Sequence, residues 1–193
     1  MLYVGSDIAA GISWEGYSFT SQAVSELRGL GAPTRTFLSP ILFIYAVLEL
    51  VFGAGIWGSA GQKRTLRVTG AIFIGLGILD LTGPLLSMDA SQAVSSVTNI
   101  IHIIATIVTL ISIFLIIGFG SMAGGKWFFG YSAVTFMIVL VFGALTFLEL
   151  GRIAANLPTP WMGVKERINI YSYMLWMAML AIVLLRKRIN KEG

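Results

Sequence analysis

Long apolar runs separated by short polar segments dominate this chain. Five runs, at about residues 37–58, 68–87, 97–120, 127–150 and 164–185, each hold roughly 20 mostly apolar residues. A helix of that length crosses the hydrocarbon core of a bilayer with its backbone hydrogen bonds satisfied internally. The pattern predicts an all-α polytopic transmembrane helix bundle with five full spans, forming one integral membrane domain over residues 1–193.

Residues 1–12 are also apolar but too few to cross a bilayer. They lack the charged leading region and the small-residue cleavage site of a signal peptide. We interpret this short N-terminal stub as the last turns of a helix whose beginning precedes it. The expected parent architecture therefore has six helices.

Composition excludes several protein classes. Of 193 residues, 56% are hydrophobic and 11% charged, whereas soluble domains average about 25% charged residues. With 13 basic and 9 acidic residues, the chain lacks the basic surface that nucleic-acid binding requires. The absence of cysteine excludes disulfides, thiolate catalysis and cysteine-ligated metal sites.

Basic residues predict the orientation, because they concentrate on the cytoplasmic side of membrane proteins. One predicted side holds Lys63, Arg64, Arg67, Lys126, Arg186, Lys187, Arg188 and Lys191. We expect this side and the C-terminus to be cytoplasmic in the cell membrane. Residues 13–36 then lie outside.

Two outer segments carry distinct patterns. In residues 17–32, apolar positions recur at helical spacing until Gly29, Gly31 and Pro33 stop them. This segment is either an amphipathic helix on the outer membrane face or a connector that packs on the bundle. In the other segment, Pro158 and Pro160 forbid a helix, and Trp161 suits an interfacial anchor.

Ionisable residues inside apolar spans are candidates for function, because burying them in a membrane costs several kcal/mol unless they are paired. Asp80 and His102 lie toward the outer ends of their spans, whereas Glu49 lies near the middle. We expect an outward-opening pocket holding Asp80 and His102, with Glu49 too deep to share it. The alternative is a structural role for all three residues. His102 and Glu49 would then form hydrogen bonds with residues packed against them, and Asp80 would bond to backbone groups that lose their helical partners near Pro84.

Charged residues at the outer boundary extend this candidate site. We expect Glu26 to pair with Arg167, locking the outer segment as a lid over the pocket. An ordinary ion-pair network that includes Glu149 is the alternative. The complete predicted binding set is Glu26, Arg28, Asp80, His102, Trp161, Glu166 and Arg167.

The chain offers few ligands for a metal or cofactor. With one histidine and no cysteine, only a carboxylate-dominated site could form, which suits magnesium or calcium better than zinc. We expect neither a metal nor a cofactor. Glycines inside the spans, such as Gly70, Gly75 and Gly77, and the pairs Ala54/Gly58 and Ala71/Gly75, indicate close helix packing.

Several outer motifs resemble a known family. They are Gly16-Tyr17-Ser18, Ser21-Gln22, Ser25-Glu26-Leu27, Gly31-Ala32-Pro33, the run from Leu157 through Pro158, Thr159, Pro160, Trp161 and Met162 to Gly163, Glu166-Arg167 and Trp176. Together with His102 they are similar to the multi-pass family called domain of unknown function 998. The resemblance covers essentially the whole chain and departs at the start, where family members have a complete first helix. It implies a distant relation to the six-helix Frag1/DRAM/Sfk1 group, and it implies no reaction.

Three classes of function remain. The first is a non-enzymatic integral membrane protein that binds a lipid or a membrane partner through the outer pocket. The second is a small intramembrane enzyme acting on a lipid-type substrate, with Asp80 and His102 as catalytic acid–base residues. The third is an ion-coupled transporter or channel using Glu49 and Asp80, which with so few helices would require an oligomer. The expected partners are membrane lipids, and a second copy or another membrane protein, with no nucleic acid.

Overall fold

The structure, a computed structural model, describes residues 2–155 and 157–192, with side chains described up to residue 189. Within these residues it is all-helical and contains no strand. The elements in order are α1 (Leu2–Ser13), the 3-10 helix η1 (Val24–Arg28), α2 (Arg35–Ser59), α3 (Arg64–Leu81), the 3-10 helix η2 (Gly83–Leu85), α4 (Val97–Gly120), the 3-10 helix η3 (Ser121–Ala123), α5 (Lys126–Leu148), α6 (Leu150–Ala154) and α7 (Met162–Glu192). The all-α class is confirmed, while Met1 of the stub and the side chain of Lys191 lie outside the described residues.

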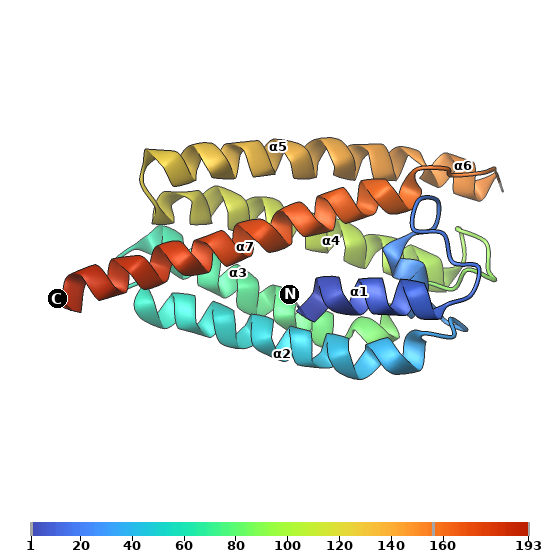
Figure 1. The fold of residues 1–193 in the computed structure, drawn as a ribbon, viewed down its shortest axis with the longest axis horizontal. Helices are drawn as coiled ribbons and strands as arrows, with labels where there is room; N and C mark the ends of the chain where they lie inside the picture. The colour runs from blue at the N-terminus through green and yellow to red at the C-terminus, as the bar shows by residue number, and fades with distance from the viewer. Residues whose placement is uncertain (1, 156, 193) are drawn as a thin grey trace.

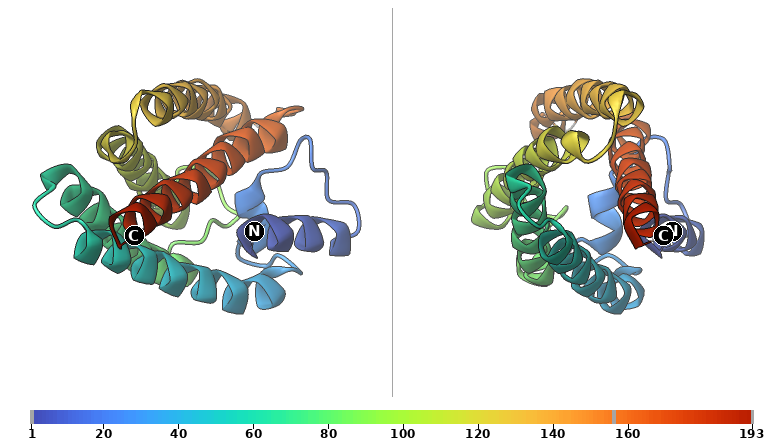
Figure 2. Two further views of the ribbon diagram at one scale, coloured as in Figure 1. Left: turned by 60° about the vertical axis from the view of Figure 1, so that its left-hand side comes forward. Right: turned by 90° about the vertical axis from the view of Figure 1, so that its left-hand side faces the viewer.

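The long helices run along one common axis (Figure 1) and form a ring around it in the order α1, α2, α3, α4, α5 and α7 (Figure 2). Each helix from α1 to α5 packs directly on the next one in this order, and α5 packs on α7. The segment containing η1 lies inside the ring (Figure 2). Its Val24 and Leu27 are buried accordingly.

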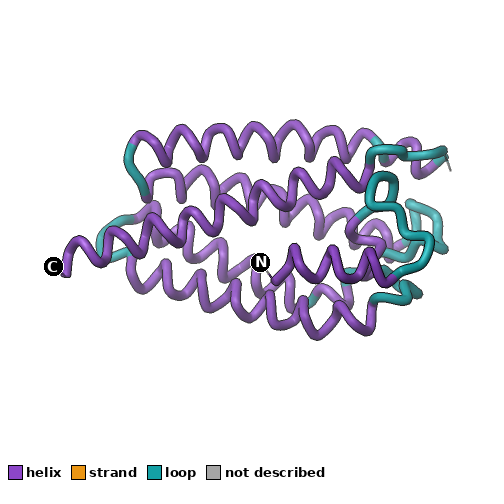
Figure 3. Tube along the Cα trace, in the orientation of Figure 1, coloured by secondary structure: helices purple, strands orange, loops and turns teal. Residues whose placement is uncertain are grey.

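The two ends of the ring differ in character. The long connections, residues 14–34, 82–96 and 157–161, gather at one end, called here the loop end (Figure 3). The opposite basic end carries the short connections between α2 and α3 and between α4 and α5, together with the C-terminal part of α7. Residues predicted to share one side, such as Lys63, Lys126 and Lys187, therefore do share one end of the bundle. Its assignment to the cytoplasm stays a prediction.

Four helices in the described chain are long and apolar enough to cross a membrane: α2, α4, α5 with α6, and α7. The predicted second span, residues 68–87, is not among them, so the count of five is not confirmed. Its helix α3 ends at Leu81 because Thr82, Gly83 and Pro84 turn the chain into η2. The 18 residues of α3 also include three charged ones, Arg64, Arg67 and Asp80.

The first helix, α1, is about half as long as its neighbour α2. Its 12 residues extend about 18 Å, against about 37 Å for the 25 residues of α2. It lies along the loop-end half of the bundle (Figure 1). The ring of six is therefore complete only in that half.

Residues 17–32 form a shorter helix than the amphipathic pattern predicts. The described helix is η1, five residues in 3-10 conformation. The backbone breaks soon after it, because Gly31 has φ of +82°, a conformation that favours glycine. Since Ala23, Val24 and Leu27 are buried against the bundle, this segment matches the alternative of a packed connector.

The basic-end half has a solid aromatic core. Trp176, Phe73 and Phe128 are fully buried there. Trp176 stacks on Phe128 with ring centroids 5.9 Å apart, and its indole N–H donates to Ser132 Oγ at 2.8 Å. This core leaves the interior of the loop-end half as the region where a cavity can form.

Glycines bring α2 and α3 into close contact. A Cβ built on Gly70 would lie 2.7 Å from the backbone nitrogen of Trp57, and one on Gly53 would lie 2.8 Å from that of Ile74. Gly77 is equally tight, against Leu50. The packing role predicted for Gly75 and for the pair Ala54/Gly58 is wrong, because a Cβ on Gly75 or Gly58 would meet nothing within 4 Å and Ala54 is exposed.

The tight contact at Gly70 and the open space at Gly75 predict different effects of a glycine-to-alanine substitution at these two positions of α3. Gly70→Ala should lower the free energy of unfolding in detergent by about 1–3 kcal/mol, because backbone atoms of α2 must move. Gly75→Ala is the matched control and should leave stability unchanged or slightly higher. Equal loss in both variants would contradict the close α2–α3 packing.

Candidate functional site

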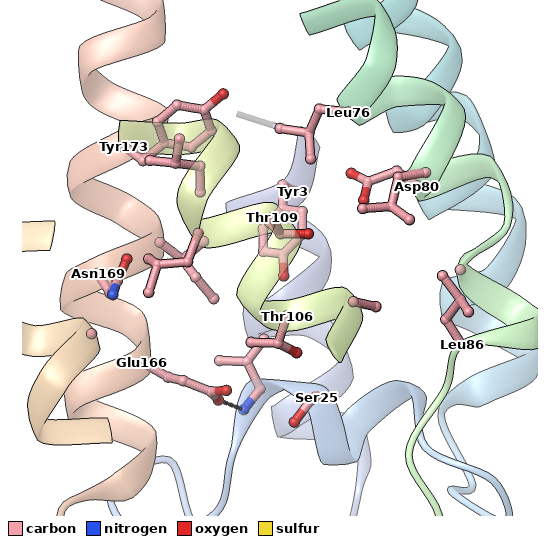
Figure 4. A pocket seen from close by; sticks show the side chains of 18 of the residues that line it. Tyr3, Ser25, Leu76, Asp80, Leu86, Thr106, Thr109, Glu166, Asn169 and Tyr173 are labelled. Atoms are coloured by element: carbon pink, nitrogen blue, oxygen red, sulfur yellow. Dashed lines mark hydrogen bonds between the residues drawn. The ribbon is translucent and has the colours of Figure 1, made fainter. Parts of the chain in front are cut away.

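A cavity of about 200 Å³ lies inside the loop-end half of the ring. We call it the chamber. Every long helix contributes to its wall, as does η1. Its polar lining residues are Tyr3, Ser25, Arg28, Tyr45, Glu49, Asp80, His102, Thr106, Thr109, Thr146, Glu166, Asn169 and Tyr173. Figure 4 shows Asp80 of α3 across the chamber from Asn169 and Tyr173 of α7.

Helical periodicity places these side chains on common faces. His102, Thr106 and Thr109 lie on one face of α4, which is otherwise strongly apolar. Glu166, Asn169 and Tyr173 do the same on α7. Sequence reasoning singled out only His102 and Glu166 from these faces. The signal that could have found the others is helical spacing: Thr106 and Thr109 lie four and seven residues after His102, and Asn169 and Tyr173 lie three and seven residues after Glu166.

Glu49 lines the same chamber as Asp80, so the prediction that it lies too deep to share the pocket is wrong. The chamber reaches the middle of the bundle, where α2 and α3 pack closely. The two carboxyl groups interact electrostatically across that contact. Glu49 is only 3% exposed. Its carboxyl oxygens pair with no amide, hydroxyl or cationic group of the described residues, and its one side-chain hydrogen-bond partner there is the carboxyl group of Asp80.

Asp80 and His102 both line the chamber, as predicted, but no hydrogen bond joins them within the described chain. His102 Nδ1 donates instead to Leu86 O at 2.9 Å. The backbone near Pro84 is satisfied by other groups, since Thr82 Oγ1 donates to Leu79 O at 2.6 Å and Ser87 Oγ to Gly83 O at 3.1 Å. Asp80 is therefore not needed for that structural task, and its carboxyl group faces the chamber.

At the loop end, η1 covers the end of the chamber that lies farthest from the basic end. Glu166 of α7 accepts a hydrogen bond from the Val24 N–H (Figure 4), which fixes η1 to α7. Ser25 and Arg28 of η1 face the chamber. Arg28 interacts electrostatically with Asp80 and Glu166.

The contact between α1 and α7 is an ion pair that sequence analysis did not predict. Arg167 Nε and Nη2 each donate to an Asp7 carboxylate oxygen at 3.0 Å, and Tyr171 Oη donates to the same carboxylate. The Asp7 side chain is 2% exposed and that of Arg167 11%. Arg167 also donates to Phe19 O at 2.9 Å and lies over the Phe19 ring.

The predicted pairing of Glu26 with Arg167 is wrong. Glu26 Oε1 accepts from the Ala23 N–H at 2.8 Å and Oε2 from Gln22 Nε2 at 3.0 Å, so its carboxylate stabilises the start of η1. Asp7 instead pairs with Arg167, because each of its two carboxylate oxygens accepts a hydrogen bond from a different guanidinium nitrogen. Such two-point pairs are stronger than single hydrogen bonds. Neither Glu26 nor Arg167 lines the chamber.

Tyr17 links this ion pair to η1. Its hydroxyl accepts from Arg167 Nη2 at 3.0 Å and donates to Ala23 O at 2.9 Å. Burial raises the pKa of Tyr17 to about 12, against the opposing effect of the Arg167 hydrogen bond. The phenol therefore stays protonated at neutral pH and keeps its donor role.

The remaining boundary residues lie outside the chamber. Glu149 pairs with Lys165 and, at 3.5 Å, with Arg152, which joins the end of α5 to the start of α7. Trp161 is 60% exposed at the loop end. In the described residues no group of three or more His, Cys, Asp or Glu side chains is placed to hold a metal ion.

A double-mutant cycle tests which acid pairs with Arg167. Asp7→Asn should lower the free energy of unfolding by about 3–5 kcal/mol, because it leaves a buried guanidinium without its charge partner. Combined with Arg167→Gln, it should show a strong coupling energy. Glu26→Gln combined with Arg167→Gln should instead be additive within about 0.5 kcal/mol; the reverse pattern would contradict the geometry.

Comparisons with known proteins place this architecture in a family. Neither the curated proteins nor the solved structures contain a significant match. One family model, described as protein of unknown function (DUF998), matches residues 1–183. The match covers all the helices that line the chamber, and the motifs that resembled this family lie within it. The chain belongs to the DUF998 family.

Proposed function

We propose that this protein is a non-enzymatic integral membrane protein that binds an amphiphilic, lipid-type ligand in the chamber. The observation that carries the proposal is the chamber itself, a cavity of about 200 Å³ lined by apolar helices. Its wall combines apolar residues such as Leu76, Leu110 and Ile113 with carboxyl, hydroxyl and amide groups. Sites of this mixed character between helices suit ligands with a polar head and an apolar body.

The position of the chamber supports binding from the outer side of the cell membrane. The chamber lies in the half of the bundle opposite the basic end, and a cytoplasmic basic end follows from the usual distribution of Lys and Arg. In this orientation the C-terminus is cytoplasmic. The exposed Trp161 then serves as an anchor at the outer membrane interface rather than as a lining residue.

The enzyme alternative has less support. General acid–base catalysis requires proton donors and acceptors within hydrogen-bond reach of a reacting group. His102 is engaged with the Leu86 carbonyl, and no hydrogen bond connects it to Asp80 in the described chain. The chamber therefore supplies polar contacts without the assembled Asp80–His102 pair that the enzyme alternative requires.

A transport pathway is the second candidate, and the adjacent carboxyl groups of Glu49 and Asp80 favour it. Such a pathway must continue to the other side of the membrane. Below the chamber, the fully buried Phe73, Phe128 and Trp176 fill the interior of the basic-end half. This packing favours a closed binding site over a continuous path.

Filling the chamber with a side chain tests the proposal. The full chain is purified in mild detergent, and the amphiphiles that remain bound are extracted and quantified by mass spectrometry. Ala105→Phe places a ring in the chamber and should reduce the retained ligand about tenfold, equivalent to about 1.4 kcal/mol of binding. Ile104→Phe is the matched control, because Ile104 is exposed on the outside of the same helix, and should retain the wild-type amount.

Two outcomes would contradict ligand binding in the chamber. One is a wild-type protein that retains no amphiphile above the level of a detergent blank. The other is equal retention by the Ala105→Phe and Ile104→Phe variants.

A further inference from the structure

We propose that the inner end of the chamber is an ammonium-binding subsite formed by Glu49, Asp80, Tyr45 and Tyr173. The ligand would then carry a protonated amine. This inference rests on the proposed function and specifies the chemical class of the ligand. It concerns the part of the chamber nearest the middle of the bundle.

The first argument is a set of buried polar atoms without partners. Both carboxyl oxygens of Glu49 and the hydroxyl of Tyr173 are buried and pair with no amide, hydroxyl or cationic group of the described residues; the one side-chain partner of Glu49 is the carboxyl group of Asp80. Each side chain belongs to a residue that is only 3% exposed, and both residues line the chamber. Buried polar groups are otherwise nearly always paired. Three oxygens at one cavity that pair with no amide, hydroxyl or cationic group therefore indicate a ligand that donates hydrogen bonds.

The second argument is the balance of charge around the chamber. Its lining contains three carboxyl groups, of Glu49, Asp80 and Glu166, and one guanidinium, of Arg28. Arg28 lies on η1 at the loop end, and Glu166 is already engaged by the Val24 N–H. Arg28 acts electrostatically on Asp80, whereas no cationic side chain of the described residues acts on Glu49. A cation beside Glu49 and Asp80 would offset the cost of burying their carboxyl groups.

The third argument concerns the kind of cation. Calcium and magnesium take about six or more oxygen ligands, and the described residues offer no cluster of three acidic or histidine side chains. An ammonium group donates three hydrogen bonds and is also attracted by aromatic faces. Tyr45 and Tyr173 line the same region, and Tyr3 packs on Tyr45 with ring centroids 5.4 Å apart. This combination suits an amine better than a metal ion.

Ligand-induced thermal stabilisation of the full chain in detergent tests the proposal with three probes. Octylammonium has both a chain and a charge, 1-octanol has the chain alone, and ethanolammonium has the charge with almost no chain. Both amines are protonated at neutral pH, as lysine is. We expect octylammonium to bind most tightly, and Glu49→Gln to weaken it about tenfold or more while leaving 1-octanol unchanged.

Matched variants separate a specific subsite from surface charge. Glu15→Gln removes an exposed carboxylate at the loop end and should leave the affinity for octylammonium unchanged. If Glu49→Gln fails to fold, Asp80→Asn and Tyr173→Phe provide the same comparison. Ethanolammonium distinguishes a free amine from a lipid head, because similar affinities for ethanolammonium and octylammonium would identify the amine alone as the ligand.

The outcomes for the two proposals can be told apart. Equal binding of octylammonium and 1-octanol, unchanged in Glu49→Gln, would overturn the ammonium subsite and leave amphiphile binding intact. Glu49-dependent binding of ethanolammonium without binding of either octyl compound would support the subsite and overturn the lipid-type ligand. Absence of binding by all three probes would overturn both.

Discussion

The buried ion pair between Asp7 and Arg167 is the contact on which the loop-end half of this membrane protein depends. It joins α1 to α7, and these two helices close the ring. The same guanidinium donates hydrogen bonds to Phe19 O and to the hydroxyl of Tyr17. The Tyr17 hydroxyl in turn donates to Ala23 O, directly before η1. A charge buried among apolar helices is stable only with its partner. This one ion pair therefore fixes the positions of α1, α7 and η1, which all line the chamber.

The bundle divides into two halves with different physical roles. In the basic-end half, aromatic side chains around Trp176 fill the interior, and the close approach of α2 and α3 at Gly70 leaves no space between them. In the loop-end half, the six helices surround a cavity with carboxyl groups in its wall. A cavity in the loop-end half, with a tightly packed core between it and the basic end, is the arrangement of a binding site that is closed toward the basic end.

Much of the fold could be predicted from hydropathy, because long apolar runs have few alternatives to helices. The family was also recognised from its motifs and confirmed. The exceptions have local causes, since Gly83 and Pro84 shorten α3 and a glycine-rich stretch shortens η1. Of the seven residues in the predicted binding set, Arg28, Asp80, His102 and Glu166 line one cavity, whereas Glu26, Trp161 and Arg167 do not. The Asp7–Arg167 pair could not be predicted, because its partners lie 160 residues apart and no periodicity relates them.

The most direct test of the chamber uses single cysteines, since the natural chain has none. Thr109→Cys places a thiol in the chamber, and Val108→Cys places one on the exposed apolar side of α4. A thiol must ionise to react, which requires a polar environment. The account predicts that Thr109→Cys reacts with a methanethiosulfonate reagent carrying an ammonium group faster than with its sulfonate counterpart, and that Val108→Cys reacts with neither. Equal reactivity at both positions, or a faster reaction with the sulfonate, would contradict a polar, cation-binding chamber.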